Sequence, residues 1–279
     1  MRSVQLIGAL LCLAATAIAQ PLAASVTHED EAKLTGDELY QRVLDNRFNS
    51  YVQKFMMHSG DRGGNVQTVE IDLKYLNFRG NDKKILSKSI AKYQRPQEVR
   101  HLGYLVINKA SGADDQFVYR PSSRRVRRVN LRGEAVFGTD FSFEDILPQE
   151  FEDASYARIP DAQVDEHDCF VVEVTPRADS NPEYSKFVVY VDKLNYVPLR
   201  TLYWDDKGLK VKELNSDAES IARYQDVEDG EPKEVWMATE SKIVHLQQQT
   251  YTELVVMELT PNPNLRQRDF SERELTSGH

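Results

Sequence analysis

The stretch VQTVEIDLKYLNF, residues 66–78, carries the pattern that decides the fold. Apolar side chains at positions 69, 71 and 73 alternate with charged side chains at positions 70, 72 and 74. A repeat of two is typical of a β-strand with one buried face. The same kind of pattern predicts further strands at residues 84–93, 99–108, 116–120, 124–131, 169–175, 186–191, 197–204, 208–214, 220–226, 234–245 and 250–259.

Short turns separate most of these predicted strands, and only residues 141–168 interrupt the series. Short connections are typical of antiparallel strands, because parallel strands need a long crossover that usually contains a helix. A large, twisted antiparallel sheet tends to curl. We therefore predict a mainly β protein with some α: a highly curved antiparallel sheet, an incomplete barrel, wrapped around an N-terminal helix.

That helix is predicted at residues 36–57, with Thr35 or Asp37 as its N-cap. Its apolar residues recur at helical spacing, and they need a partner surface. We expect the helix to act as a lid or plug of the curved sheet. A second lid candidate is the short turn at residues 141–147, which Pro148 ends.

The first 19 residues are typical of a secretory signal peptide. Arg2 precedes an apolar run, and Ala17-Ile18-Ala19 forms a cleavage pattern. The run is too short to span a bilayer. Cleavage would leave 260 of the 279 residues and change the formal charge from −9 to −10. We expect a flexible leader at residues 20–34 and a single domain at residues 35–275.

The acidic balance argues against a general nucleic-acid binder, since neutralising phosphates requires a basic surface. The sequence carries none of the common motifs for nucleotide binding, zinc-dependent hydrolysis or serine hydrolysis. We therefore predict no cofactor, no metal and no catalytic residue.

His167 and Cys169 form the one pair that resembles a base and a nucleophile. A hydrolase that uses them is one hypothesis, although no oxyanion-stabilising motif accompanies the pair. The alternative, which we favour, is a buried, unreactive Cys169 at the start of a strand and an exposed His167.

Six arginines fall within thirteen residues: Arg120, Arg124, Arg125, Arg127, Arg128 and Arg132. One interpretation is a site for an anionic ligand. The other, which we favour, is ion pairing with the acidic residues at 140–153. On a strand, alternation sends Arg125 and Arg127 to one face and Arg124 and Arg128 to the other. We predict that Asp140 or Asp145 pairs with Arg124 or Arg128.

Two segments carry a family resemblance: FVYRPSSRRVRRV at residues 117–129 and FGTDFSFEDI at residues 137–146. They resemble the signature of the LolA-like outer-membrane lipoprotein-sorting family of Gram-negative bacteria. Thr139 and Phe143 are mild departures from the usual Ser and Tyr. Weaker matches extend the resemblance over residues 35–275.

The resemblance implies a LolA- or LppX-like periplasmic half-barrel with a helical lid around a hydrophobic cavity. It also implies binding of lipid or lipoprotein acyl chains, and work beside an inner-membrane transporter of the RND type. We expect the protein to be a monomer. An alternative use of the same scaffold is a sensory or regulatory module that docks a membrane protein.

Two sets of site residues follow. The first set, as ligand-binding or family-motif residues, comprises Tyr119, Pro121, Arg124, Arg128, Phe137, Gly138, Asp140, Phe141 and Asp145. The second set, as cavity or lid residues, comprises Leu39, Val43, Phe55, Tyr190, Tyr203, Trp204 and Trp236.

Overall fold

The computed structural model describes residues 33–131, 133–147, 149–178 and 182–277. Every element below belongs to one compact unit, Thr35–His279. The predicted signal peptide at residues 1–19 and nearly all of the predicted leader at 20–34 lie outside the described residues. None of the helices in the described ranges is both long enough and apolar enough to cross a membrane.

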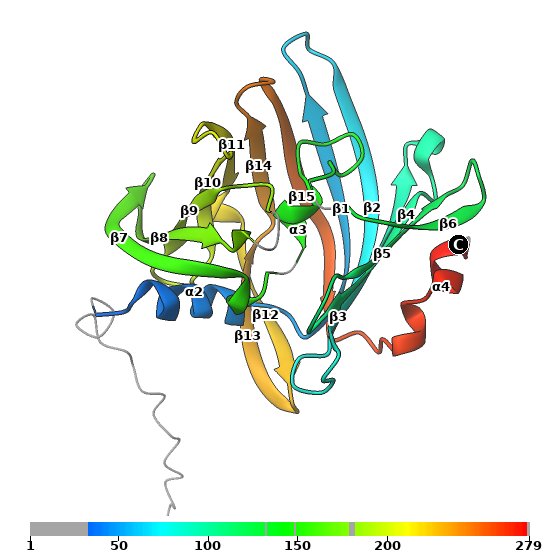
Figure 1. The fold of residues 1–279 in the computed structure, drawn as a ribbon, viewed down its shortest axis with the longest axis horizontal. Coiled ribbons are helices and arrows are strands. Elements are labelled where there is room, and N and C mark those ends of the chain that lie inside the picture. Colours follow the sequence, from blue (N-terminus) through cyan, green and yellow to red (C-terminus); the bar gives the residue numbers. More distant parts are fainter. Residues whose placement is uncertain (1–32, 132, 148, 179–181, 278–279) are drawn as a thin grey trace, which may run out of the picture. The chain divides into compact units, whose positions relative to one another are not determined.

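Thirteen antiparallel strands of the described chain form one curved sheet, in the order β6-β5-β4-β3-β2-β1-β15-β14-β11-β10-β9-β8-β7 (Figure 1). The strands are β1 (Ser50–Gly60), β2 (Val66–Asn77), β3 (Ile85–Arg95), β4 (Gly103–Lys109), β5 (Asp115–Arg120), β6 (Arg125–Val129), β7 (Ala154–Val164), β8 (His167–Pro176), β9 (Lys186–Asp192), β10 (Pro198–Trp204), β11 (Lys210–Ser216), β14 (Glu240–His245) and β15 (Thr250–Pro261).

The remaining elements are few and short. A separate two-stranded sheet contains β12 (Ile221–Glu228) and β13 (Glu231–Ala238). The helices are α2 (Gly36–Asp45), α3 (Phe143–Ile146) and α4 (Glu272–Thr276), with 3-10 turns η1 (Gln97–Val99), η2 (Phe151–Asp153), η4 (Ala218–Ser220) and η5 (Gln267–Asp269).

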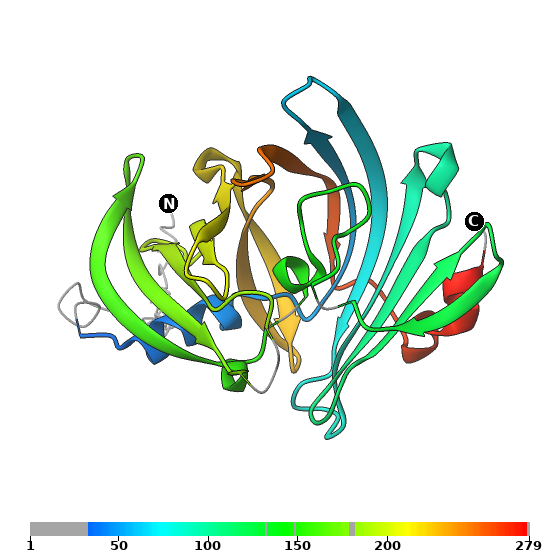
Figure 2. The same cartoon turned by 45° about the horizontal axis from the view of Figure 1, so that its top comes forward.

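The order of the strands explains why the barrel stays open. The chain builds outward from β1 to β6, which is one edge of the sheet, and resumes at β7, which is the other edge. The last strand of the chain, β15, pairs with the first strand, β1. The first and last strands in the sequence are therefore neighbours inside the sheet. The edge strands β6 and β7 do not pair with each other. The predicted mainly β class and the curved, unclosed antiparallel sheet are therefore confirmed (Figure 2).

The prediction of one helix over residues 36–57 is wrong in its second half. Thr35 caps α2 as expected, but the helix ends at Asp45, and residues 50–60 form β1. Strand β1 pairs with β2 on one side and with β15 on the other. Its buried side chains, including Phe55 and Met57, alternate along the strand. Backbone pairing on both sides overrides an apolar spacing that also fits a helix.

Strand β7 was not predicted, and β13 and β14 were predicted as one strand. Pro160 lies in β7, where the register shifts between Ile159 and Ala162. Proline is tolerated on an edge strand or at a bulge, because no ladder hydrogen bond is lost there. The strand predicted at residues 234–245 is divided, because the chain leaves the two-stranded sheet after Ala238 and enters the large sheet at Glu240.

Helix α2 packs against β7 and β8 in one half of the sheet. Gly36 permits this contact, since a Cβ there would lie 2.6 Å from the backbone nitrogen of Arg158. Figure 2 shows α3, and not α2, between the two curved halves of the sheet. The expected wrapping of the sheet around the N-terminal helix is not confirmed.

The half of the sheet formed by β1–β6 packs an apolar cluster on each of its faces. On its concave face Phe55, Ile71, Tyr93 and other buried residues form one cluster. On its convex face Ile90 and Leu105 pack against a second cluster that includes Phe270 and Leu275 from the C-terminal segment. That segment therefore covers a sheet face that would otherwise be exposed.

Truncating Leu275 tests this covering role. Leu275 is 1% exposed, so Leu275→Ala is expected to lower the free energy of unfolding by about 2–5 kcal/mol. Urea denaturation measures the change. Leu194→Ala is the matched control, because Leu194 is 86% exposed. Equal stability of the two variants would show that the C-terminal segment is not part of the folded core.

Candidate functional site

The segment between β6 and β7, residues 130–153, crosses the concave face of the sheet. It joins the two opposite edges of that sheet. Midway it forms α3, and the buried side chains of Phe141 and Phe143 join the concave apolar cluster. We call residues 130–153 the crossing segment.

Helix α3 is a single turn fixed by its own cap. The Ser142 hydroxyl accepts a hydrogen bond from the Asp145 backbone nitrogen at 3.3 Å, and Asp145 Oδ2 accepts from the Ser142 backbone nitrogen at 2.7 Å. This reciprocal capping box satisfies backbone donors that the helix itself cannot pair. The Asp145 carboxylate therefore has one oxygen committed to the turn.

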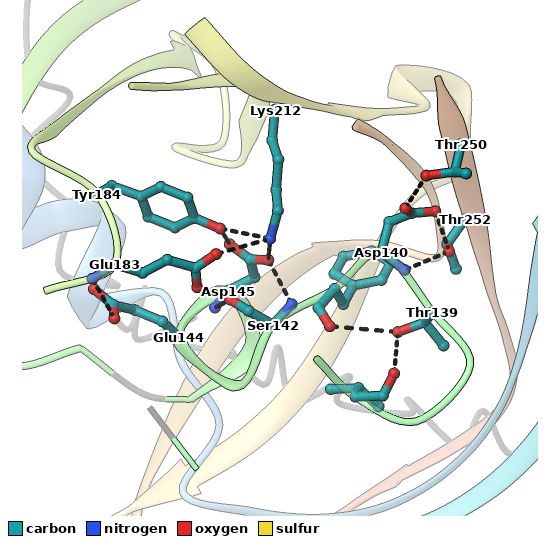
Figure 3. Close-up of polar contacts among 12 residues, drawn as sticks. Thr139, Asp140, Ser142, Glu144, Asp145, Glu183, Tyr184, Lys212, Thr250 and Thr252 are labelled. Atoms are coloured by element: carbon teal, nitrogen blue, oxygen red, sulfur yellow. Dashed lines mark hydrogen bonds and ion pairs between the residues drawn. The ribbon is translucent and has the colours of Figure 1, made fainter. Parts of the chain in front are cut away.

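The same carboxylate ties α3 to the far half of the sheet (Figure 3). Lys212 of β11 places its Nζ 3.2 Å from Asp145 Oδ2 and 3.2 Å from Glu183 Oε1. The Tyr184 hydroxyl donates to Asp145 Oδ1 at 2.8 Å and accepts from Lys212 Nζ at 2.8 Å. The Asp145 side chain is 0% exposed and that of Lys212 is 6% exposed. We call these four residues the polar latch.

Burial dominates the electrostatics of the polar latch. It raises the pKa of the Asp145 carboxyl, although Lys212, the Ser142 backbone and Tyr184 act in the opposite direction. Burial, followed by the negative charge of Asp145, also raises the pKa of the Tyr184 hydroxyl. Tyr184 therefore remains a hydrogen-bond donor to the carboxylate, and Lys212 is the cation that compensates the buried negative charge.

A second anchor lies just before α3. The backbone nitrogen of Asp140 donates to Thr252 Oγ1 at 2.8 Å, and that hydroxyl donates to Asp140 Oδ2 at 3.0 Å. Thr250 donates to the other carboxylate oxygen. Gly138 precedes this anchor with a φ of +76°, and a Cβ there would lie 2.6 Å from Gln67 Nε2. The positive φ favours glycine at this turn, whereas the flexible Gln67 side chain could move away from a Cβ.

The crossing segment is also tied to the other half of the sheet. Glu150 forms an ion pair with Arg79, whose Nε lies 2.9 Å from Glu150 Oε2. The Asn108 side chain of β4 donates to Glu150 Oε1 at 3.1 Å. Polar contacts therefore hold the segment to strands on both sides of the concave face.

The prediction that Asp140 or Asp145 pairs with Arg124 or Arg128 is wrong. Asp140 binds threonines, and Asp145 binds Lys212. Arg128 forms an ion pair with Asp115 on the neighbouring strand. It lies opposite Phe117, a residue of the convex cluster, so the sheet separates it from the crossing segment.

A mainly apolar cavity of about 260 Å³ lies between α3 and the concave face. Strands β1, β2, β3, β4 and β15 form its floor, and the crossing segment covers it. Its lining residues are Tyr51, Gln53, Phe55, Met57, Leu73, Tyr75, Ser89, Ala91, Tyr104, Val106, Phe143, Ile146, Leu147 and Leu254. This volume is just under the range of about 300–1,000 Å³ for ligand pockets.

The predicted cavity and lid residues are dispersed over the fold. Phe55 alone belongs to the lining of this cavity. Leu39 is buried on α2, where Val43 is half-buried, and Tyr203 packs against Tyr184. Tyr190, Trp204 and Trp236 are half-buried and do not line the cavity. Tyr190 packs near Leu199, the Lys186 ammonium lies over the Trp204 ring, and the Arg223 guanidinium lies over the Trp236 ring.

The first predicted set divides between the two faces. Phe141, Asp140, Gly138 and Asp145 belong to the crossing segment, where Phe137 is also found, 46% exposed. Tyr119 instead packs against the convex cluster. Pro121 and Arg124 lie in the β5–β6 turn, where Arg124 has a φ of +51°. The structure therefore brings part of this set to the crossing segment, and leaves the rest on the convex face or in the β5–β6 turn.

Cys169 is fully buried in β8 against Val164 and Leu199, as predicted. Burial raises the pKa of its thiol to about 11. A thiol that stays protonated at neutral pH is a poor nucleophile. The hydrolase hypothesis thus loses its candidate nucleophile.

Sequence reasoning did not find Lys212, Tyr184 or Glu183. Lys212 is the only buried residue of β11, Lys210–Ser216. A lysine on the buried face of a strand is a signal for a buried carboxylate partner, because an unpaired charge there is costly. The sequence does not show which carboxylate that partner is.

Removing Lys212 is expected to be strongly destabilising. Lys212→Met leaves Asp145 buried without its cation and should lower the free energy of unfolding by about 3–5 kcal/mol at pH 7. Chemical denaturation measures this change. Lys242→Met is the control, since the side chains of the Lys242–Glu253 pair on the neighbouring strands are both 45% exposed and such pairs contribute about 1 kcal/mol or less.

The loss of stability caused by Lys212→Met should become smaller as the pH is lowered. The pKa of Asp145 is raised in the folded protein, so its ionisation destabilises the fold as pH rises through that pKa. The cost of Lys212→Met should therefore shrink as the pH is lowered and Asp145 is protonated. The double variant Lys212→Met/Asp145→Asn should lack this recovery. A cost of Lys212→Met that is constant with pH would contradict the assigned ion pair.

Comparisons with known proteins agree with this architecture. A family model described as an uncharacterized protein matches residues 86–277. No curated protein is found to match the chain. An outer membrane lipoprotein-sorting protein domain from Vibrio parahaemolyticus has a TM-score of 0.74 and 25% identity, over 87% of this chain and 98% of that one.

Two further solved structures are similar. A DUF1329 family protein from Desulfovibrio piger has a TM-score of 0.75 and 25% identity, over 86% of this chain and 97% of that one. A LolA superfamily protein from Nitrosomonas europaea shares the fold, with a TM-score of 0.64 and 16% identity, over 86% of this chain and 99% of that one. The chain therefore belongs to the family that the matching model defines, and its fold is similar to that of the LolA superfamily protein and of the lipoprotein-sorting domain.

Proposed function

We propose that this protein is a periplasmic carrier that binds acyl chains of lipids or lipoproteins in the cavity beneath the crossing segment. The observation that carries the proposal is the apolar cavity of about 260 Å³ between α3 and the concave sheet. Burial of an acyl chain contributes about 0.8 kcal/mol per CH₂ group, so an apolar cavity needs no catalytic group to hold one. The likeness to a lipoprotein-sorting domain supports the same function.

The crossing segment has the properties of a lid over this cavity. Phe143, Ile146 and Leu147 point apolar surface at the cavity, while the polar latch and the Asp140 anchor hold the segment to the sheet. Displacing α3 would add the space of those three side chains to the cavity. A small cavity that enlarges when its lid moves suits a carrier, which must release its cargo.

Export by a signal peptide at residues 1–19 and action beside an inner-membrane RND-type transporter are further parts of this proposal. They rest on the N-terminal sequence pattern and on the family resemblance. In this role the protein would act as a monomer that carries cargo between membranes.

Filling the cavity should abolish binding without unfolding the protein. Ala91 lines the cavity floor on β3, so Ala91→Trp places an indole where the acyl chain would lie. We expect at least tenfold weaker binding of a fluorescent fatty acid, measured by titration. Ala113→Trp is the matched control, since Ala113 is exposed in the β4–β5 turn, and its affinity should equal that of the unchanged protein.

Native cargo provides the second measurement. Lipid extraction and mass spectrometry of protein purified from the periplasm should detect a bound acyl lipid or lipoprotein. A protein that carries no lipid and takes up no fatty acid would refute the carrier. A stable membrane-protein partner bound to such an empty protein would favour the sensory module instead.

A further inference from the structure

Three arginines share the concave face at the β6 edge of the sheet. Arg120 of β5 lies directly opposite Arg125 of β6, so their side chains project from the same face. Arg127 lies two residues beyond Arg125 and therefore also on that face. It is paired with Val118, a buried member of the concave cluster, which identifies the face as the concave one. We call Arg120, Arg125 and Arg127 the arginine triad.

Nothing within the described chain neutralises the arginine triad. All three side chains are exposed, and none forms an ion pair with a described carboxylate. By contrast, Arg128 on the other face of β6 pairs with Asp115, and Arg95 of β3 pairs with Glu70. Like charges directly opposite on neighbouring strands are destabilising. In a chain with a net charge of −9, this cluster is a local concentration of unmatched positive charge.

The arginine triad adjoins the apolar cavity. Tyr104 of β4, which lines the cavity, pairs with Val118 of β5, and Val118 pairs with Arg127 of β6. These three residues form one row across three strands on the concave face. Strands are about 4.8 Å apart, so the Arg127 backbone lies about 10 Å from that of Tyr104.

The charges of Arg120 and Glu134 both affect the pKa of the Tyr104 hydroxyl. Burial raises its pKa, and the positive charge of Arg120 acts in the opposite direction, while Glu134 of the crossing segment adds to the rise. Glu134 is exposed and forms no ion pair with Arg120 within the described residues. Arg120 therefore lies within electrostatic range of a group on the cavity wall.

We propose that the arginine triad is a binding site for a phosphate-type anion, supplied by the headgroup of a lipid whose acyl chains occupy the adjoining cavity. This inference rests on the proposed function and names its substrate class, an anionic phospholipid. Guanidinium groups suit this ligand, because they donate paired hydrogen bonds to phosphate oxygens and stay charged at all physiological pH values.

The experiment compares two lipids with the same short acyl chains, phosphatidylglycerol and uncharged diacylglycerol, by calorimetric titration below their micellar concentrations. We expect the full chain to bind phosphatidylglycerol at least tenfold more tightly. The variant Arg120→Gln/Arg125→Gln/Arg127→Gln should lose this preference while still binding diacylglycerol. The control Arg62→Gln/Arg268→Gln/Arg273→Gln removes the same charge at exposed positions elsewhere and should keep the preference.

Equal affinity for both lipids in the unchanged protein, or a preference that survives in the triad variant, would overturn the headgroup site and leave the lipid carrier standing. Failure of both lipids to bind would instead refute the carrier. Titration with inorganic phosphate then tests whether the arginine triad binds an anion at all. Phosphate binding that is lost in the triad variant and kept in the control variant upholds the anion site. Absence of phosphate binding to the unchanged protein overturns the site.

Inorganic phosphate also distinguishes the source of the anion. If it competes with phosphatidylglycerol but binds at least tenfold more weakly, the ligand is a lipid headgroup. If it binds as tightly as the phospholipid, the site serves free phosphate and the acyl chain contributes nothing to its occupancy, which overturns the lipid assignment.

Discussion

The buried ion pair between Asp145 and Lys212 fixes the segment on which the interior of this fold depends. Strands β6 and β7 are opposite edges of one open sheet, and their connection packs Phe141 and Phe143 into the apolar cluster on the concave face. A backbone in that position requires partners for its polar groups, since it lies over apolar side chains. Asp145 meets this requirement twice, as the cap of α3 and as the partner of Lys212 and Tyr184.

These contacts explain the structural role of the motif at residues 137–146. Gly138 makes the turn, Asp140 binds the threonines of β15, and Asp145 binds Lys212 within the polar latch. Between them Phe141 and Phe143 enter the concave cluster. The polar residues of the motif thus hold the cover of the cavity, while its aromatic residues form the apolar underside.

The two halves of the sheet differ in what fills them. Leu39, Tyr40 and Leu44 of α2 are buried where the helix packs on β7 and β8. The half formed by β1–β4 and β15 retains the cavity, with α3 above it. The arginine triad lies at the outer edge of this second half. An apolar space with unmatched positive charge beside it is the arrangement that an anionic amphiphile fits.

The alternation of apolar and charged residues, as at 66–78, predicted most of the strands and the curved antiparallel sheet. It did so because the side-chain period of a strand is set by local backbone geometry. The same local reasoning extended the helix α2 through Phe55 and Met57, where the apolar spacing fits both a helix and a strand. It also missed β7, which contains Pro160. It also paired Asp145 with an arginine nearby in the sequence, whereas Lys212 is 67 residues away. Strand positions follow from short-range periodicity, but the polar latch, the cavity and the unmatched charge of the arginine triad follow from which distant strands become neighbours, and that is fixed only when the whole sheet has folded.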